Sequence, residues 1–501
     1  MKKQSILTIM TVLLVMSLLA GCSNGKTAST STDGGDLPFV ELKMIYPVNA
    51  NSTRDQEMVT DEINKYLKEK INASVVLEAL DSSTFYQKLP IMITAGENFD
   101  ISWVNPTFLL QNVNKNAFMK LDDLLDSHGQ DIKEILPPLL LDGVKVNGEL
   151  FSLPVFKEYG IGTTYYFRED IVEELGLDVM NIKTLRDLEP LMDKVKQSYP
   201  DIAPFYVEGG SMDPFLPASL DEERMFDVAG LTDKICFNPE DGKFYNKLEM
   251  PSTLERNKIF SEWFAKGYIN KDATTTNVNW SDAIKIEKSW FAGTSSKPGM
   301  EDSLSKTVGF NMIRGYGEET YVRTGSLMGS MNAISITSKN PERAMMLLNL
   351  LYSDKELLNL FNFGIEGKHY TKVNENVIKL PEGLTVAADT GYAPGIDWRI
   401  GNNYNLFIWD YEPADKWEQY KTFSEDAQTD PLLGFYFDTT NVKNELSTIN
   451  NLQTSYDLPL KAGVFDVEEA TEKYVQKLKE AGIDRVIEEV QNQYDSWKSG
   501  N

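Results

Sequence analysis

Histidine and cysteine are scarce in this chain. Its 501 residues include two histidines, His128 and His369, and two cysteines, Cys22 and Cys236. Zinc sites, Ser-His-Asp triads and Cys-His pairs all depend on histidine, so two histidines far apart in sequence argue against these chemistries. The sequence also has no His-Glu-x-x-His pattern. We therefore expect no catalytic residues, no metal site and no cofactor.

Basic residues are outnumbered by acidic ones, 49 Lys and Arg against 75 Asp and Glu, which leaves a net charge of −26. Such a chain repels phosphate backbones and anionic lipid, so nucleic acid is not expected as a partner. Hydrophobic residues make up 42% of the sequence and aromatic residues 11%, enough to bury a sizeable core. The length predicts two or three domains.

The N-terminal segment resembles a bacterial lipoprotein signal. Lys2 and Lys3 precede an apolar run over residues 6–19, which is too short to span a bilayer comfortably, and Leu19-Ala20-Gly21-Cys22 is similar to a lipobox. We predict a lipoprotein signal peptide over residues 1–21 and a lipid anchor on Cys22. The acylated chain would then lie at the extracytoplasmic face of the cell membrane, bound to it through the lipid alone. Acylation of Cys22 leaves Cys236 without a disulfide partner.

The segment after Cys22 carries no apolar side chain larger than alanine, so residues 22–36 are predicted to be a flexible tether. The following pattern is of the α/β class. Strands are predicted at residues 42–46, 75–80 and 100–104, with a helix after Thr53-Arg54-Asp55-Gln56, which is similar to a capping box. Parallel pairing of these strands would place a ligand site at their carboxyl ends, near Tyr46 and Trp103.

Several later segments resemble the extracellular solute-binding proteins of ABC importers, family 1. They are Leu150-Phe151-Ser152-Leu153-Pro154, Tyr166-Phe167-Arg168-Glu169-Asp170-Ile171, Thr184-Leu185-Arg186-Asp187-Leu188, Met331-Asn332-Ala333-Ile334-Ser335-Ile336 and Asn340-Pro341-Glu342-Arg343-Ala344. Further segments, at residues 352–354, 364–370, 398–403 and 431–494, resemble the LipO-like lipoprotein branch. The stretch from Lys288 to Gly293 departs from that pattern, because relatives carry smaller residues there.

The resemblance implies a two-lobed, periplasmic-binding-protein-like (type II) fold with hinge crossings and a C-terminal helical extension. It assigns residues 37–157 and 330–372 to lobe 1, and residues 158–329 and 373–501 to lobe 2 and the extension. The implied function is that of a membrane-anchored substrate-binding lipoprotein, which captures an oligosaccharide in the inter-lobe cleft by hinge closure and delivers it to permease subunits. A monomer without enzymatic activity is expected.

Two other functions stay open. The chain could bind a peptide or another small solute, and an acidic oligosaccharide would require Arg323 or Arg399 to meet its carboxylate. A surface glycosidase with two carboxylates is the second alternative. With 75 acidic residues, the sequence alone does not discriminate against such a pair.

A neutral oligosaccharide presents apolar C–H faces and hydroxyl groups, which suit aromatic platforms flanked by Asn, Glu, Arg and Tyr. Trp103 and Trp398 are the strongest candidates, whereas Trp263, Trp417 and Trp497 lie on helical stretches and are interpreted as packing residues. The predicted ligand-binding residues are Tyr46, Trp103, Asn105, Glu158, Tyr159, Trp280, Trp290, Arg323, Trp398, Asn402, Asn403 and Trp409.

Some candidates have an equally plain structural interpretation. Glu158 and Tyr159 follow the first predicted crossing and would line either the cleft floor or a solvated turn. Arg323 would contact either the ligand or a carboxylate across the lobes. Glu366 and His369 are expected to form a buried pair that holds a loop, and Cys236 is expected to be an inert thiol in a strand.

Overall fold

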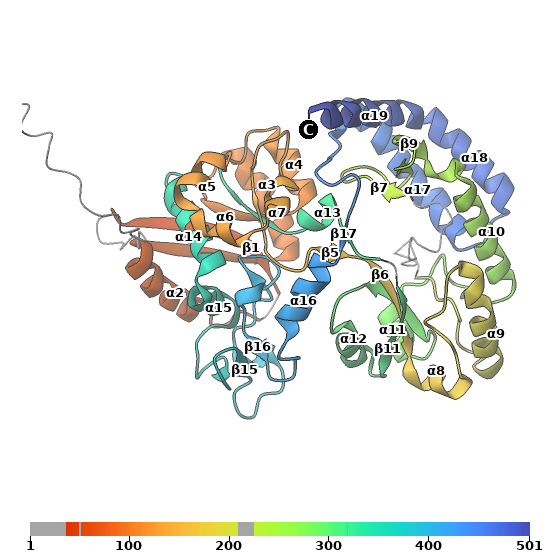
Figure 1. Ribbon diagram of the computed structural model, residues 1–501, viewed down its shortest axis with the longest axis horizontal. Helices are drawn as coiled ribbons and strands as arrows, with labels where there is room; N and C mark the ends of the chain where they lie inside the picture. Colours follow the sequence, from red (N-terminus) through yellow and green to blue (C-terminus); the bar gives the residue numbers. More distant parts are fainter. Residues whose placement is uncertain (1–36, 50–51, 209–224, 318, 501) are drawn as a thin grey trace, which may run out of the picture.

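The computed structural model describes residues 37–49, 52–208, 225–317 and 319–500. They form two α/β lobes and a helical C-terminal part that lies above the second lobe in Figure 1. The predicted signal peptide, Cys22 and the tether fall outside the described residues. Across the described ranges, no helix is both long enough and apolar enough to cross a membrane.

The first lobe is built on a five-stranded sheet in the order β2-β1-β3-β13-β4. The strands are β1 (Val40–Val48), β2 (Ala73–Asp81), β3 (Ile101–Val104), β4 (Leu153–Pro154) and β13 (Met331–Ile334). Strand β1 pairs in parallel with β2 and β3, as predicted, whereas β13 is antiparallel to β3 and β4. Strand β13 enters after the chain has passed through the second lobe, so it approaches the sheet from the opposite direction.

Helices cover this sheet with apolar stripes. They are α2 (Gln56–Ile71), α3 (Ser82–Ala95), α4 (Pro106–Val113), α5 (Asp122–His128), α6 (Gln130–Ile135), α7 (Pro138–Asp142), α14 (Pro341–Ser353) and α15 (Lys355–Phe363). Helix α14 shows the pattern most clearly, because Ala344, Leu347, Leu348 and Leu351 are fully buried at spacings of three or four residues. Helix α14 begins with Pro341 as its first residue, a position where the missing N–H of proline costs no intrahelical hydrogen bond.

The second lobe holds a three-stranded antiparallel sheet in the order β10-β6-β11. Its elements are β6 (Thr163–Arg168), α8 (Glu169–Leu175), η2 (Leu185–Leu188), α9 (Glu189–Ser198), α10 (Pro251–Ala265), α11 (Trp280–Lys285), β10 (Phe291–Ser295), α12 (Met300–Val308) and β11 (Met312–Gly317). Its core contains the fully buried Trp263 and Trp290. The packing role predicted for Trp263 is therefore confirmed.

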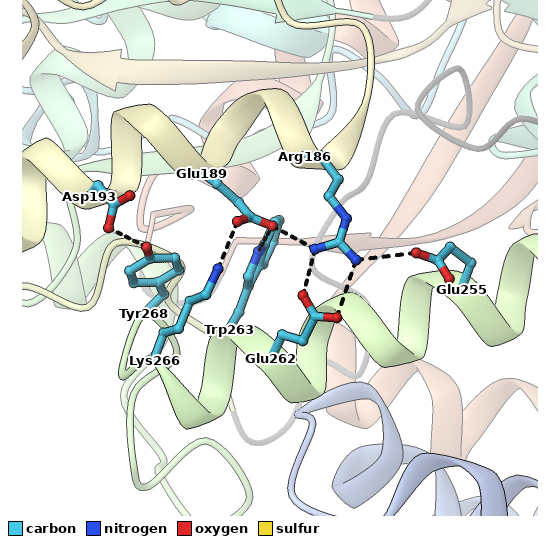
Figure 2. A network of polar contacts seen from close by, with 8 residues as sticks. All are labelled: Arg186, Glu189, Asp193, Glu255, Glu262, Trp263, Lys266 and Tyr268. Carbon is cyan, nitrogen blue, oxygen red and sulfur yellow. Dashed lines mark hydrogen bonds and ion pairs between the residues drawn. The ribbon is translucent and has the colours of Figure 1, made fainter.

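A polar network joins the η2–α9 segment to α10 (Figure 2). Arg186 is its centre, with an Nη1 to Glu189 Oε1 distance of 2.9 Å, an Nη1 to Glu262 Oε2 distance of 2.5 Å and an Nη2 to Glu255 Oε1 distance of 3.2 Å. Glu189 also accepts hydrogen bonds from the Trp263 indole and from Lys266. The network connects two helices whose apolar sides pack in the same core.

Three short strands carry the chain between the two lobes. They are β5 (Gly160–Ile161), β12 (Tyr321–Val322) and β17 (Gln428–Thr429), which pair with one another in the order β17-β12-β5. The first crossing leads from β4 to β6, the second from β11 to β13, and the third from the first lobe to the C-terminal helices. The predicted hinge crossings are confirmed, and their strands lie in one small sheet.

The C-terminal part packs on a second small sheet, β7-β8-β9. Its elements are β7 (Phe226–Asp227), β8 (Ile235–Asn238), β9 (Lys243–Asn246), α17 (Lys443–Lys461), α18 (Val467–Glu480) and α19 (Ile483–Gly500). Strands β8 and β9 form a hairpin that turns at Asp241-Gly242, where Gly242 has φ 70°. Cys236 is buried in β8, and Trp497 packs on Phe435 and Tyr494, as expected.

The segment between residues 373 and 425 does not pack where the expected domain bounds placed it. Tyr392, Ile396, Ile400 and Leu406 belong to the core of the first lobe, although residues 373–501 were assigned to the second. The same segment contributes β15 (Val377–Lys379), β16 (Ile408–Trp409) and α16 (Lys416–Glu425), which lie on the first-lobe side in Figure 1. We therefore propose that lobe 1 extends to the third crossing, near residue 427.

The predicted capping box before α2 is wrong. Asp55 occupies the N-cap position but its side chain makes no capping hydrogen bond. Its carboxylate instead lies 3.0 Å from Lys368 Nζ and 3.2 Å from His369 Nε2. The contact joins residues more than 300 positions apart, so the local sequence pattern carried no sign of it.

Candidate functional site

The two strongest sequence candidates, Trp103 and Trp398, lie against each other. Trp103 is the penultimate residue of β3, and its ring centroid is 5.8 Å from that of Trp398 with the planes at 88°. Trp103 is 2% exposed, and its indole N–H donates to Ser330 Oγ at 2.7 Å, directly before β13. Trp398 is 39% exposed. Trp103 is therefore the support, and Trp398 is the surface that a ligand can reach.

Arg399 helps to fix the Trp398 indole. Its guanidinium carbon lies 4.1 Å from the Trp398 ring centroid, and Nη1 donates to the Gly395 carbonyl at 2.6 Å. Burial lowers the pKa of Arg399, although the nearby Asp397 carboxylate raises it. Because the guanidinium is committed to the indole and a carbonyl, we regard Arg399 as a positioning residue.

Tyr86 belongs to the same cluster and was missed by sequence reasoning. It is 46% exposed, and its ring centroid lies 6.4 Å from that of Trp103. The Asn105 side-chain amide donates to the Tyr86 hydroxyl at 3.3 Å, while Asn105 Oδ1 caps α4 by accepting the Phe108 N–H at 2.8 Å. The signal was available in α3, where Phe85 and Leu89 are buried and the adjacent Tyr86 necessarily points elsewhere.

Groups from the hinge and the second lobe lie near Tyr420 of α16. Lys297 Nζ lies 3.5 Å from Glu158 Oε1 and 5.9 Å from the Tyr420 ring centroid. Burial raises the pKa of Tyr420, and the negative charges of Glu158, Glu412 and Asp397 add to the effect. These carboxylates therefore lie near one phenol.

The charges in this region are largely paired within the protein. Glu158 is paired with Lys297, and Glu412 Oε1 lies 2.7 Å from Lys416 Nζ. A region of balanced charge, with aromatic faces and carboxylate acceptors, suits a neutral ligand rich in hydroxyl groups better than an anion. The arrangement argues against the acidic oligosaccharide that the sequence left open.

Trp409 lines a pocket of about 320 Å³ that lies within the first lobe. Its ring is parallel to that of Tyr411, with an interplanar angle of 5° and centroids 6.1 Å apart, and it meets Phe363 edge-on at 5.6 Å. Trp417, expected to be a packing residue, donates its indole N–H to the Leu406 carbonyl at 2.7 Å but also lines the pocket.

Four predicted ligand residues are buried structural groups. Tyr46 and Trp290 are both fully buried, and the Trp290 indole donates to the Pro204 carbonyl at 2.9 Å. Asn402 is 5% exposed, donates to the Tyr352 carbonyl and accepts the Tyr404 N–H. Asn403 is 4% exposed, and its backbone N–H donates a hydrogen bond to the Phe156 carbonyl. These four side chains are buried, so they are not among the ligand contacts that we propose.

Three other candidates lie at the hinge or in the second lobe. Arg323 was expected to contact either the ligand or a carboxylate, and its Nε lies 3.5 Å from Asp430 Oδ2, as in an ion pair. Tyr159 is half-buried between hinge segments, and its backbone N–H donates to Ser424 Oγ at 3.1 Å. Trp280 is half-buried against the small core of Tyr166 and Ile284 in the second lobe.

The expected pair of Glu366 and His369 does not form. His369 is buried and contacts Asp55, whereas Glu366 lies 3.1 Å from Lys372 on the surface. A loop-holding role of His369 is therefore retained with a different partner. Within the described parts of the chain, no group of three or more His, Cys, Asp and Glu side chains is arranged to hold a metal ion.

Comparison with known protein families gives two matches. Residues 49–356 match a family described as bacterial extracellular solute-binding protein, and residues 431–499 match a domain of unknown function, DUF3502. The second match begins directly after the third hinge crossing. A carbohydrate ABC transporter substrate-binding protein of Streptococcus pneumoniae serotype 4 is 28% identical over 487 residues, covering 96% of this chain and 95% of the relative.

Among solved structures, the N-glycan transport solute binding protein NgtS from S. pneumoniae is similar, with a TM-score of 0.78 and 25% identity over 91% of this chain and 98% of that chain. NgtS in complex with Man1GlcNAc gives a TM-score of 0.68 at 26% identity, over 91% of this chain and 99% of that chain. The NgtS complex with Man5GlcNAc gives a TM-score of 0.66 at 25% identity, over 92% of this chain and 99% of that chain. These likenesses span both lobes and the C-terminal helices.

Proposed function

Because the chain belongs to the bacterial extracellular solute-binding protein family, we propose that it is the substrate-binding subunit of an ABC importer, specific for a neutral oligosaccharide. The observation that carries the proposal is the contact between Trp103 and the exposed Trp398 at the end of a parallel strand. An indole held rigidly by a buried partner offers a stacking face for the C–H side of a sugar ring. The carbohydrate-binding relative and the glycan complexes of NgtS support this ligand class.

The paired charges around α16 point to a receptor that leaves its ligand intact. Glu158 and Glu412 each have a lysine partner, and the relative that matches 96% of this chain is a substrate-binding protein. We propose that the chain is not an enzyme and that hinge closure holds the glycan between the lobes. Binding residues proposed here are Trp398, Tyr86 and Asn105 on the first lobe, with Trp103 as the support.

Export and a lipid anchor on Cys22 are further parts of the proposal. They are supported by the lipobox-like Leu19-Ala20-Gly21-Cys22 and by the extracellular family to which the chain belongs. The permease subunits would then bind a monomer at the outer face of the membrane. Mass spectrometry of the membrane-extracted protein tests the anchor, because acylated Cys22 would be the new N-terminal residue.

Isothermal titration calorimetry with Man1GlcNAc, Man5GlcNAc, kestose and a mixed peptide pool tests the ligand class. We expect saturable binding of a neutral glycan and a change in tryptophan fluorescence, because Trp398 becomes covered. Binding of peptides with silence toward every glycan would contradict the proposal. Chromatography of the glycan after prolonged incubation separates a receptor, which returns it unchanged, from a hydrolase.

A further inference from the structure

The pocket that contains Trp409 is separate from the Trp398 surface and belongs to one lobe. Its lining comes from Asn49 after β1, from Asn362 and Phe363 at the end of α15, from His369, and from residues 387–417, all of which pack in the first lobe. The pocket therefore exists whatever the position of the second lobe. Its volume of about 320 Å³ lies at the small end of the range for ligand pockets and would hold roughly one or two sugar rings.

One side of the pocket is aromatic and preorganised. The Trp409 ring meets the edge of Phe363 at 5.6 Å, and the backbone N–H of Trp409 donates to Glu412 Oε2 at 3.1 Å. Tyr411 lies parallel to Trp409 and is 57% exposed. Two parallel rings, one fixed and one open to solvent, offer the stacking surface that a pyranose ring requires.

The rest of the lining mixes polar and apolar side chains. Asn49, Asp397, Glu412 and Lys416 line the pocket, and Glu412 is paired with Lys416 at 2.7 Å. The Asn49 side chain packs closely against Gly395. A Cβ added to Gly395 would lie only 2.0 Å from Asn49 Nδ2. Gly395 has φ 64°, so a larger residue there would be strained and would displace Asn49. Amide and carboxylate groups held in place can form hydrogen bonds with the hydroxyl or N-acetyl groups of an uncharged sugar.

The second lobe reaches the rim of this pocket. Lys306, in α12, lies 4.5 Å from the Tyr411 ring centroid, although α12 and residue 411 belong to different lobes. A ligand in the pocket would therefore alter a contact between the lobes. Asp397 lines the pocket and is the residue next to Trp398, so the pocket and the Trp398 surface are adjacent.

We propose that this pocket is a second saccharide subsite, which takes one end of the same neutral glycan while Trp398 contacts another ring. This inference rests on the proposed function. It specifies the substrate class as a glycan of several rings, with an uncharged terminal hexose or N-acetylhexosamine in the pocket. The proposal predicts selectivity for the length of the glycan. A glycan too short to reach from the pocket past Asp397 to Trp398 contacts only one of the two stacking surfaces.

The test compares Tyr411→Ala with wild type by calorimetry on Man1GlcNAc and Man5GlcNAc. Tyr411 is exposed, so the variant should fold, and thermal unfolding checks this. Phe39→Ala is the matched control, because Phe39 is also an exposed aromatic residue of the first lobe, at 52%. We expect Tyr411→Ala to weaken Man5GlcNAc binding about tenfold and to reduce the affinity difference between the two glycans. Phe39→Ala should change neither quantity.

Two outcomes overturn the inference in distinguishable ways. If Tyr411→Ala binds both glycans like wild type while Trp398→Ala loses them, the receptor function holds and the pocket is not a subsite. If wild type binds neither these glycans nor other neutral oligosaccharides, the proposed function fails and the subsite fails with it. A crystal structure of the Man5GlcNAc complex with a ring against Trp409 and Tyr411 would support the proposal directly.

Discussion

At the scale of single residues, the site depends on how one buried indole supports one exposed indole. The sequence indicated both Trp103 and Trp398, because each follows or precedes a polar loop, and the structure brings them together. The sequence did not indicate that Trp103 is the buried support and Trp398 the exposed ring, since the exposure of each ring depends on which distant residues pack against it. Trp290 and Asn402 show the same limit, because their local sequence is loop-like but their side chains are buried by distant segments.

Removal of the exposed indole tests the platform. We expect Trp398→Ala to weaken glycan binding tenfold or more, because the stacking surface of a large aromatic side chain is lost. The fold should persist, since Trp398 is 39% exposed and Trp103 remains buried. Calorimetry gives the affinity and circular dichroism confirms folding. An unchanged dissociation constant would remove Trp398 from the site.

His369 gives a pH-dependent prediction. Its Nδ1 accepts the Ile365 N–H at 2.9 Å, so the ring proton lies on Nε2, which donates to Asp55 Oδ2 at 3.2 Å. Burial lowers the pKa of His369 and Lys368 lowers it further, although Asp55 raises it. Between the lowered value and the usual value near 6.5, the unfolded chain binds more protons than the folded one, so stability falls as the pH drops through this window.

The prediction is that His369→Gln loses less stability than wild type when the pH is lowered from 7.5 to 5.5. Urea unfolding at both pH values measures the difference. His128→Gln is the natural control, because His128 is the other histidine of the chain and lies at the end of α5. An identical pH dependence in His369→Gln and wild type would contradict a lowered pKa of His369 in the folded protein.

At the scale of elements, apolar spacing predicted helices and strands well, whereas polar details were less predictable. The buried stripe of α14 and the hairpin at Asp241-Gly242 follow from local sequence alone. The capping box before α2 did not form, because the helix begins at Gln56 and the Gln56 side chain donates to Thr60 Oγ1 at 3.2 Å. Asp55 takes the N-cap position, and its carboxylate contacts Lys368 and His369. Polar side chains choose among all groups that the fold brings near, so their partners are set by the tertiary structure.

The network around Arg186 offers a test at this scale (Figure 2). Arg186 contacts Glu189, Glu255 and Glu262, but it is 43% exposed, so screening limits the gain. We expect Arg186→Ala to cost about 1 kcal/mol or less, with a smaller cost at high salt. Thermal unfolding at two salt concentrations measures this.

Trp263→Phe provides the comparison for the Arg186 variant, because it changes the same helix interface in the core. Its cost should exceed that of Arg186→Ala and should be independent of salt, because it removes buried apolar contacts and a hydrogen bond to Glu189. A salt-independent loss in Arg186→Ala would show that the arginine acts through packing and not through charge.

At the scale of the whole molecule, the two-lobed α/β fold was predicted by the family resemblance and is confirmed. The boundary near residue 373 was not, because the chain stays on the first lobe for about fifty residues more and crosses a third time at β17. Nothing in the composition of residues 373–425 distinguishes a segment that packs on one lobe from one that packs on the other.

Small-angle X-ray scattering tests closure of the lobes. We expect the radius of gyration of wild type to decrease on saturation with Man5GlcNAc, because we propose that the hinge closes over the bound glycan. Trp398→Ala should show no decrease at the same glycan concentration. Saturating binding without any change in the scattering curve would mean that the glycan is held by the first lobe alone.

The short sheet formed by β5, β12 and β17 has a mechanical consequence. Three adjacent, hydrogen-bonded connections restrict the relative motion of the lobes more than two separate connections would, and they favour rotation about an axis near this sheet. Displacements then grow in proportion to the distance from that axis, so the outer edges separate widely while the residues at the base scarcely move. A bulky, irregular molecule can thus enter sideways without any unfolding of either half.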